Sequence, residues 1–417
     1  MFKIVARLRF TGTENEDCEM KLLFISMANR RPAVIVLALC LLLAGNLAAR
    51  AQDAFYEASP QEVLGPPGTI IRQERLFVGL FLSAKAYRVL YRSTGLKGEP
   101  IAVSGTIVVP TGAAPAGGRP ILAWAHPTSG IVPRCAPSLA LFKFQQIQGL
   151  RDMVRHGYIV TATDYPGLGT PGPHPYLVGM SEGRAVLDSL RAARNLSDAE
   201  AGSQVAVWGH SQGGQAVLYA GLLVKRYAPE LRLVGVAAAA PATDLGTLLR
   251  DDFATPGGKN LLAMTLWSWA RVFGAPIDKV VLPAARPVVN RLAEDCIESP
   301  IDIKPRAEIG KELQQRFLRV KNLTSLQPWR SLLAQNTIGI LPSNIPIFLA
   351  QGEADTTVDP AVTQHYAKRL CAAGSPVQLV MMPKVGHALA ADRSAKAAVQ
   401  WISERFTGGP PPNNCGS

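Results

Sequence analysis

Seven short apolar runs rich in Val, Ile, Leu and Ala recur along the chain from about residue 100, with helical periodicity in most of the intervals between them. Several runs are apolar throughout, as expected of strands that are buried on both faces of a sheet. This alternation is typical of an α/β protein with a mostly parallel sheet and flanking helices. The predicted strands are 101–110, 120–126, 157–163, 204–209, 233–240, 346–350 and 377–383, and the predicted helices are 180–194, 212–227, 360–373 and 392–406.

Residues 245–340 interrupt this alternation. They contain no predicted strand, and their apolar residues follow helical spacing, as in Leu262, Leu266 and Trp269. A segment of about a hundred helical residues inserted between strands indicates a cap that covers one edge of the sheet.

The longest apolar run lies near the N-terminus, at 32–48. It follows Arg30 and Arg31 and leads into Ala49-Arg50-Ala51, a small-x-small pattern that signal peptidases cut. Because its apolar part is shorter than the roughly 20 residues of a spanning helix, we predict a secretory signal cleaved after about Ala51. An uncleaved membrane anchor is the alternative.

Residues 1–26 match no targeting pattern, and a start at Met20 or Met27 would place basic residues just before the apolar run. We therefore expect 1–51 to be a signal peptide that carries a mis-assigned N-terminal extension. The exported domain would be 52–417, secreted or periplasmic.

The chain is basic, with 43 Lys and Arg, 31 Asp and Glu, and a formal net charge of +12. Its basic residues are scattered, and the longest runs are pairs such as Lys225 and Arg226. A nucleic-acid surface needs positive charge concentrated along one groove or face. We therefore expect no nucleic-acid partner.

A G-x-S-x-G pattern centred on Ser211 lies within GHSQGG, directly after a predicted buried strand and directly before a predicted helix. That context predicts a strained turn that raises the serine hydroxyl above the sheet edge. Gly209 and Gly213, on either side of His210 and Ser211, are needed where a Cβ would clash with neighbouring backbone. An idle serine in a tight turn is the alternative.

A nucleophilic serine needs a base, and the base needs an orienting acid. In strand-turn-helix sites of this kind the acid and then the base follow the serine along the chain. Two histidines follow Ser211: His365 lies inside a predicted helix, whereas His387 lies in a glycine-containing loop after the last predicted strand. We choose His387 as the base.

Three carboxylates follow the strand predicted at 346–350. Asp359 is better explained as the N-cap of the helix that begins at Pro360. We choose Asp355, in the loop where the strand has just ended, as the orienting acid, with Glu353 in reserve. Asp164, which precedes the serine, is interpreted as structural.

The oxyanion of a tetrahedral intermediate needs two N–H donors. One should be the backbone of Gln212, the residue after the nucleophile. The other should come from the loop that follows the strand at 120–126, where Pro127 has no N–H, so Thr128 or Ser129 must donate. We choose Thr128.

Four of the six cysteines lie after residue 51. An exported protein favours disulfides, but four cysteines allow three pairings, and free buried thiols are the alternative. Their spacing excludes a zinc site of the CxxC type, and we expect no metal and no organic cofactor.

Five motifs together resemble the secretory-lipase family of α/β hydrolases, which includes fungal lipase A type enzymes and their bacterial relatives. They are AHPTSGIVPRCAPS at 125–138, DYPGLGTPGPHPYL at 164–177, GHSQGG, GEADTTVDP and the GH that ends at residue 387. The chain departs from the family at 126–128, where relatives commonly have HGT. The resemblance implies the α/β-hydrolase fold, a helical cap, export, ester hydrolysis, and the disulfides Cys135–Cys296 and Cys371–Cys415.

The expected activity is that of a secreted lipase or esterase that cleaves carboxylic esters through an acyl-enzyme. A peptidase or acyltransferase on the same triad stays open, because Glu294 and Asp295 in the cap could bind an amine. A catalytically inactive binding protein on this scaffold would predict a broken triad. The expected substrate is a small-molecule or lipid ester. Transient contact with lipid interfaces is left open, and the acyl length and the oligomeric state are not predicted.

Overall fold

The computed structural model describes residues 54–79, 82–251, 255–297, 303–313, 316–320 and 322–416. The chain divides into the compact units 1–53 and 54–417, and only the second is described. The signal peptide expected at 1–51 lies outside the described residues. Of the helices that the structure describes, none combines the length and the apolar character that a membrane crossing requires.

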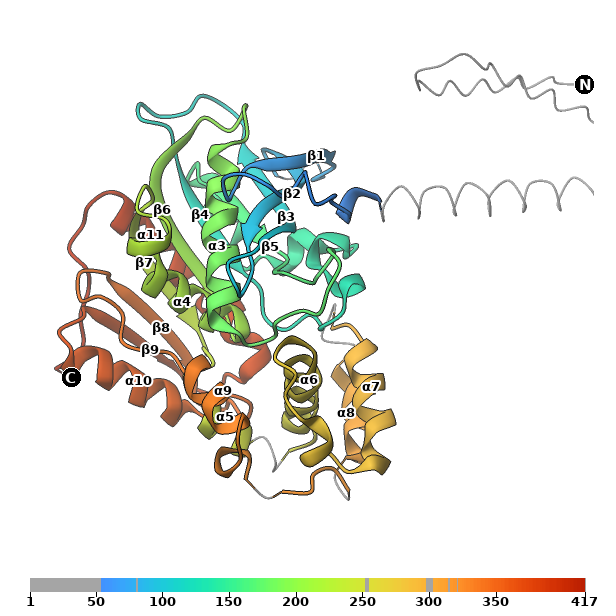
Figure 1. Ribbon diagram of the computed structural model, residues 1–417. Coiled ribbons are helices and arrows are strands. Elements are labelled where there is room, and N and C mark those ends of the chain that lie inside the picture. The colour runs from blue at the N-terminus through green and yellow to red at the C-terminus, as the bar shows by residue number, and fades with distance from the viewer. Residues whose placement is uncertain are drawn as a thin grey trace, which may run out of the picture. The chain divides into compact units, whose positions relative to one another are not determined.

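The described residues form one sheet of nine strands in the order β1-β2-β3-β5-β4-β6-β7-β8-β9 (Figure 1). The strands from β5 to β9 in this order are parallel. The three remaining pairs, β1 with β2, β2 with β3 and β3 with β5, are antiparallel. The bounds are β1 Ile70–Leu76, β2 Ala84–Thr94, β3 Pro100–Pro110, β4 Arg119–Ala125, β5 Ile159–Thr163, β6 Ala201–His210, β7 Arg232–Ala239, β8 Ile347–Gly352 and β9 Val377–Met382.

The predicted fold class is confirmed, and the seven predicted strands correspond to β3 to β9. Sequence analysis missed β1 and β2. The edge strand β1 carries four consecutive polar residues, of which Gln73, Glu74 and Arg75 are exposed, so it has no apolar run. An edge strand that faces water on one side gives a much weaker hydrophobic signal than a central parallel strand.

Helices cover the sheet and connect its parallel strands. Helices α3 and α4 pack on one another, and α11 packs on β6, β7 and β8. At the sheet centre Trp124 of β4 and Trp208 of β6 are fully buried, with ring centroids 5.7 Å apart. The bounds are α2 Leu150–Arg155, α3 Gly179–Arg194, α4 Gln212–Tyr227, α5 Leu245–Asp251, α6 Pro256–Val272, α7 Arg286–Glu294, α8 Ile303–Glu312, α9 Trp329–Asn336, α10 Pro360–Ala372 and α11 Ala390–Phe406.

Helices α5 to α9 follow one another between β7 and β8, and we call this segment, Leu245–Asn336, the helical insertion. Within it α6, α7 and α8 pack together and form a separate group beside the strands (Figure 1). Its core contains Trp269, which stacks on Trp329 with ring centroids 6.4 Å apart. Trp269 therefore packs against two aromatic residues of the insertion itself, Trp329 and Phe273.

Two disulfides link distant parts of the chain. Cys135, in the loop after β4, is bonded to Cys296, just after α7 of the helical insertion. Cys371 of α10 is bonded to Cys415 in the C-terminal tail. Both bonds join the cysteines that the family resemblance pairs.

Candidate active site

Ser211 forms the turn between β6 and α4 by itself. Its backbone has φ 57° and ψ −115°, a region that is costly for any residue with a Cβ. Three backbone bonds hold it there: its N–H donates to Ala239 O at 2.9 Å, and its carbonyl accepts from Gln215 N at 3.0 Å and from Ala242 N at 3.4 Å. Strain of this kind persists only where the surrounding structure imposes it, and it concentrates at functional sites.

Two glycines make this turn sterically feasible. A Cβ on Gly209 would lie 2.2 Å from Gly213 O, and a Cβ on Gly213 would lie 1.9 Å from Ala125 O. Since these neighbours are backbone atoms, they cannot move aside as a flexible side chain would. Both positions therefore require glycine, and the helix start lies directly against the end of β4.

Three side chains predicted from the sequence meet at this turn. His387 Nε2 lies 2.9 Å from Ser211 Oγ, and His387 Nδ1 lies 2.8 Å from Asp355 Oδ2. They come from the loops after β6, β8 and β9, which are parallel strands of one sheet, so their carboxyl ends lie at the same edge. A carboxylate on Nδ1 fixes the tautomer that leaves Nε2 free to accept the serine proton.

The carboxyl group of Asp355 is buried but well supplied with donors. Its Oδ1 accepts from the N–H groups of Thr357 at 2.8 Å and Val358 at 2.9 Å, and its Oδ2 accepts from Gln351 Nε2 at 3.1 Å. Burial opposes ionisation, but the bond to His387 and the backbone N–H bonds together hold the pKa of Asp355 below its ordinary value. The group is therefore an anion facing the imidazole.

His210 contacts the proposed base, His387, through its ring and through a hydrogen bond. Its ring lies 5.0 Å from the ring of His387, and its Nε2–H donates to the backbone carbonyl of His387 at 3.0 Å. Burial, and then the neighbouring His387, lower the pKa of His210 to about 3, so it stays neutral. From the sequence, His210 was expected only as part of the turn, and no role was predicted for Gln351.

The other carboxylates and histidines weighed in the sequence lie elsewhere. Glu353 is exposed, and His365 lies on the exposed face of α10. Asp359 caps α10 by accepting from Ala361 N at 2.8 Å, as predicted. Asp164 is buried and accepts hydrogen bonds from Ser104 Oγ, Ser138 Oγ and Ser138 N.

The backbone N–H groups of Gln212 and Thr128, the two predicted oxyanion donors, are both without a hydrogen-bond acceptor in the described part of the chain. Gln212 is the first residue of α4, where helical N–H groups have no partner inside the helix. Thr128 lies in the loop after β4, and its Oγ1 is 2.9 Å from Tyr176 Oη. The next residue, Ser129, accepts from Ile297 N at 2.7 Å through its carbonyl.

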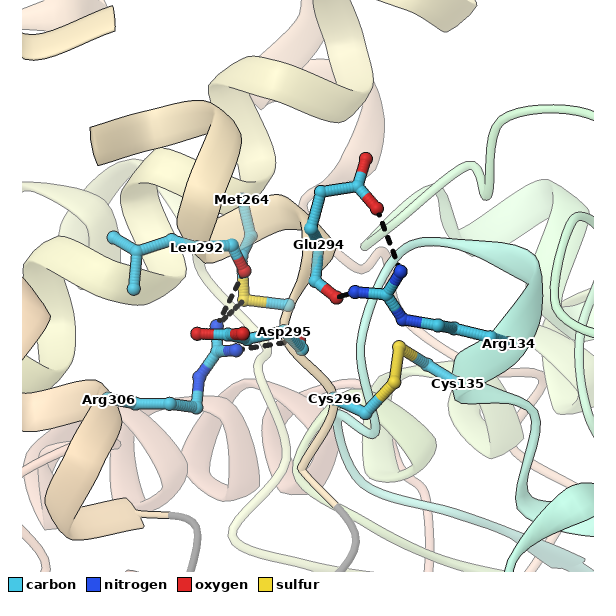
Figure 2. Close-up of a disulfide and its surroundings, with 8 residues drawn as sticks. All are labelled: Arg134, Cys135, Met264, Leu292, Glu294, Asp295, Cys296 and Arg306. Atoms are coloured by element: carbon cyan, nitrogen blue, oxygen red, sulfur yellow. Dashed lines mark hydrogen bonds and ion pairs between the residues drawn. A yellow bond between two sulfur atoms is a disulfide. The ribbon is translucent and has the colours of Figure 1, made fainter. Parts of the chain in front are cut away.

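Both acidic residues that the sequence singled out in the helical insertion contact an arginine, Glu294 through its carboxylate and Asp295 through its backbone carbonyl. Figure 2 shows Arg134 beside Glu294, with Arg134 Nη1 3.2 Å from Glu294 Oε2 and Nη2 donating to the Glu294 carbonyl. Arg306 donates to the carbonyl of Asp295 at 2.6 Å. The described part of the chain also holds no group of three His, Cys, Asp or Glu residues placed to bind a metal ion.

A buried hydrogen-bond network around the side chain of Gln212 was not predicted from the sequence. That side chain bonds Glu182 of α3 and His174 of the loop before α3. His174 belongs to the HPYL segment of a quoted family motif, which was the available signal, although no role could be assigned to it. Glu182 gave no signal, because nothing in the sequence distinguishes a buried glutamate from a surface one.

The fold and the hydrogen-bonded Ser-His-Asp arrangement are those of an α/β hydrolase. The model of the secretory lipase family matches residues 145–414, and the chain belongs to that family. The protein is therefore a carboxylic ester hydrolase.

Several relatives match most of the chain. A protein named "Probable inactive lipase MT1628" from Mycobacterium tuberculosis is 25% identical, covering 86% of this chain and 82% of its own. "Secreted triacylglycerol lipase LIP7" from Malassezia globosa is 26% identical, covering 86% and 79%. Among solved structures, Candida antarctica lipase A has a TM-score of 0.74 at 21% identity, covering 87% of each chain. The last comparison bears on the fold alone.

Proposed function

We propose that this protein is an exported serine hydrolase that cleaves carboxylic esters, lipid esters among them, through an acyl-enzyme on Ser211. The observation that carries the proposal is the position of His387, with Nε2 2.9 Å from Ser211 Oγ and Nδ1 2.8 Å from Asp355 Oδ2. That geometry couples a nucleophile, a base and an orienting acid, which the reaction requires together.

In this mechanism Ser211 Oγ attacks the ester carbonyl while His387 Nε2 takes its proton. Asp355 stabilises the imidazolium that forms, and the N–H groups of Gln212 and Thr128 donate to the oxyanion. When the tetrahedral intermediate collapses, His387 returns the proton to the leaving alcohol. Water then attacks the acyl-enzyme by the same route, releasing the acid and regenerating Ser211.

We further propose a domain organisation and an export route. Residues 1–51 act as a signal peptide cleaved after about Ala51, and 52–417 form the exported domain with a cap at about 245–340. The family, the relatives named as secreted lipases, and the two disulfides support export. The proposed cap would cover the bound substrate, and we include transient contact between the protein and a lipid interface in the proposal.

An inactive scaffold is disfavoured by the filled triad, although one relative is named as inactive. A peptidase is disfavoured because Glu294, expected to help bind an amine, already pairs with Arg134. Hydrolysis of aminoacyl amides beside matched esters separates these activities: we expect ester turnover to exceed amide turnover.

The direct test is hydrolysis of p-nitrophenyl esters over a series of acyl lengths, with Ser211→Ala beside the wild type. We expect the substitution to lower kcat by about 10⁴-fold or more. Ser203→Ala is the matched control, because Ser203 is exposed on the same strand, and it should leave kcat unchanged. Ester turnover that survives Ser211→Ala would overturn the proposal.

A further inference from the structure

The side chain of Gln212 is locked in a fully buried network. Its Nε2 donates to Glu182 Oε1 at 2.8 Å and lies 2.9 Å from His174 Nε2. Glu182 and His174 are both 0% exposed, and Gln212 is 1% exposed. Gln212 thus carries a backbone N–H at the turn and a side chain held by two other parts of the chain.

Hydrogen bonding determines which nitrogen of His174 carries the proton. His174 Nδ1 lies 2.8 Å from the carbonyl of Pro166, which can only accept, so Nδ1 is protonated. Nε2 is then the acceptor for one amide hydrogen of Gln212, and Glu182 Oε1 accepts the other. Burial lowers the pKa of His174 to about 3, which keeps the ring neutral.

Glu182 also holds the segment that precedes α3. Its Oε1 accepts from the backbone N–H of Leu177 at 2.9 Å as well as from Gln212. Its second oxygen, Oε2, has no hydrogen-bond partner among the described residues, and the same is true of Gln212 Oε1. An ionised carboxylate with one oxygen left bare in the interior would be expensive, so this environment favours the neutral acid.

The segment 174–177 joins this network to the helical insertion and to the second donor loop. Ser268 of α6 donates to the carbonyl of His174 at 2.6 Å and accepts from Tyr176 N at 3.1 Å, while Trp269 Nε1 donates to Tyr176 O at 2.9 Å. The hydroxyl groups of Tyr176 and Thr128 are hydrogen-bonded, with Oη and Oγ1 2.9 Å apart. One short segment therefore contacts the insertion and the neighbourhoods of both backbone donors.

We propose that Glu182 is a positioning residue, which acts through Gln212 and segment 174–177 to hold the two backbone donors where the oxyanion forms. The inference rests on the proposed function. Glu182 itself touches neither the substrate nor the reacting atoms. It accepts one of the two buried hydrogen bonds that hold the side chain of Gln212, and it accepts another from the backbone N–H of Leu177.

The charge of Glu182 also affects stabilisation of the oxyanion. Burial raises the pKa of Glu182 to about 8, although the bonds from Gln212 and Leu177 lower it in part. The titratable groups that face it are His174, with Nε2 3.9 Å from Oε1, and the hydroxyls of Tyr165 and Tyr219, whose pKa values burial raises. All three are neutral at pH 8, so ionised Glu182 would place an uncompensated negative charge behind the oxyanion and slow acylation.

The first test separates kcat from KM. We expect Glu182→Ala to lower kcat about 10- to 100-fold with little change in KM, because the lost alignment matters in the transition state. Glu182→Gln retains the acceptor oxygen and should restore kcat to within about threefold of wild type at pH 6. Asp188→Asn is the matched control, because Asp188 is another 0% exposed carboxylate of α3 whose partners are Ser93, Arg191 and Tyr227. Its kcat should stay at the wild-type value.

The second test asks whether Glu182 acts through Gln212. In a double-mutant cycle, Gln212→Ala should lower kcat about as much as Glu182→Ala, and the double variant should lose little more than either. Above pH 8 the kcat of the wild type should fall, and that of Glu182→Gln should not. The pH comparison needs no alanine variant, so it stands even if Glu182→Ala does not fold.

Additive losses in the cycle, or alkaline limbs that coincide in the wild type and Glu182→Gln, would overturn the inference. The same holds if Glu182→Ala folds and keeps wild-type kcat. The proposed function fails by a different result, namely turnover that survives Ser211→Ala, so the two failures are distinguishable.

Discussion

The two sides of Ser211 each contain a buried carboxyl group, and the structure treats them in opposite ways. On the base side, Asp355 receives donors on both oxygens, and its pKa lies below the ordinary value. On the oxyanion side, Glu182 receives donors on one oxygen only, and its pKa rises to about 8. Burial opposes ionisation in both groups, but only Asp355 has His387 and enough hydrogen-bond donors beside it to remain an anion.

The difference matches what each side must do. The base side stabilises a positive imidazolium, for which a fixed negative charge is useful. The oxyanion side stabilises a negative oxygen, for which a nearby anion would be harmful. The two sides also differ in their connections: the triad acid is held by its own loop, whereas the oxyanion side is bonded to α6 of the helical insertion.

The largest contrast should come from the same chemical change made on both sides. Asp355→Asn removes the anion that fixes the tautomer of His387, and we expect kcat to fall about 10³- to 10⁴-fold. Glu182→Gln replaces a neutral acid by a neutral amide and should cost about threefold or less. Steady-state kinetics on one p-nitrophenyl ester measures both. Glu353→Gln, on the exposed reserve acid, is the control, and a loss there equal to that of Asp355→Asn would contradict the assignment.

The disulfides extend the comparison to stability. Cys135–Cys296 spans 161 residues and joins the loop of Thr128 to the insertion, whereas Cys371–Cys415 spans 44 residues and fastens the tail. Replacing either pair by serine should cost about 2–5 kcal/mol in the free energy of unfolding, with the longer loop costing on the order of 1 kcal/mol more. Only Cys135→Ser with Cys296→Ser should also lower kcat. Denaturant unfolding and kinetics check both points, and equal kcat losses in the two double variants would refute the distinction.

The pH dependence of stability should separate the two carboxyls by sign. Between its ordinary pKa of 4.5 and about 8, Glu182 keeps its proton in the folded chain but loses it in the unfolded chain. Its contribution to stability therefore falls as pH rises through that window, by at most about 1.4 kcal/mol per pH unit. Asp355, with a lowered pKa, contributes stability above its ordinary pKa that is lost on acidification.

Thermal unfolding of the wild type and Glu182→Gln between pH 5 and pH 8 measures this effect. The melting temperature of the variant should rise relative to the wild type as pH increases. Curves that stay parallel over this range would show that Glu182 does not hold a proton in the folded protein.

The smallest effect is expected at the contact between the insertion and the oxyanion side. Ser268→Ala removes the hydroxyl that bonds His174 O and Tyr176 N, so it should cost about 1 kcal/mol in unfolding free energy and a few-fold in kcat. Ser331→Ala is the control, because Ser331 is a half-buried serine of α9 whose hydroxyl bonds only the side chain of Gln327 among the described residues. A Ser268→Ala enzyme with wild-type kcat would show that the insertion does not influence the donors.

The parts of this architecture that the sequence predicted are those with local signals. Buried parallel strands have continuous apolar runs, and the turn at Ser211 has glycines that its geometry requires. The triad candidates followed because parallel strands deliver their loops to one edge. β1, by contrast, lies at a sheet edge with polar residues, and Glu182 has a role only through contacts with residues 174 and 212. Contacts of that kind depend on the tertiary structure, and no local pattern encodes them.

The central claim is that one serine carries the acyl group. The most direct measurement is reaction of the wild type with a p-nitrophenyl phosphonate, followed by intact-mass analysis and peptide mapping alongside residual ester hydrolysis. We expect one phosphonyl group per chain, on Ser211, and loss of hydrolysis in step with labelling. Labelling at another residue, or full hydrolysis after Ser211 has been modified, would contradict it.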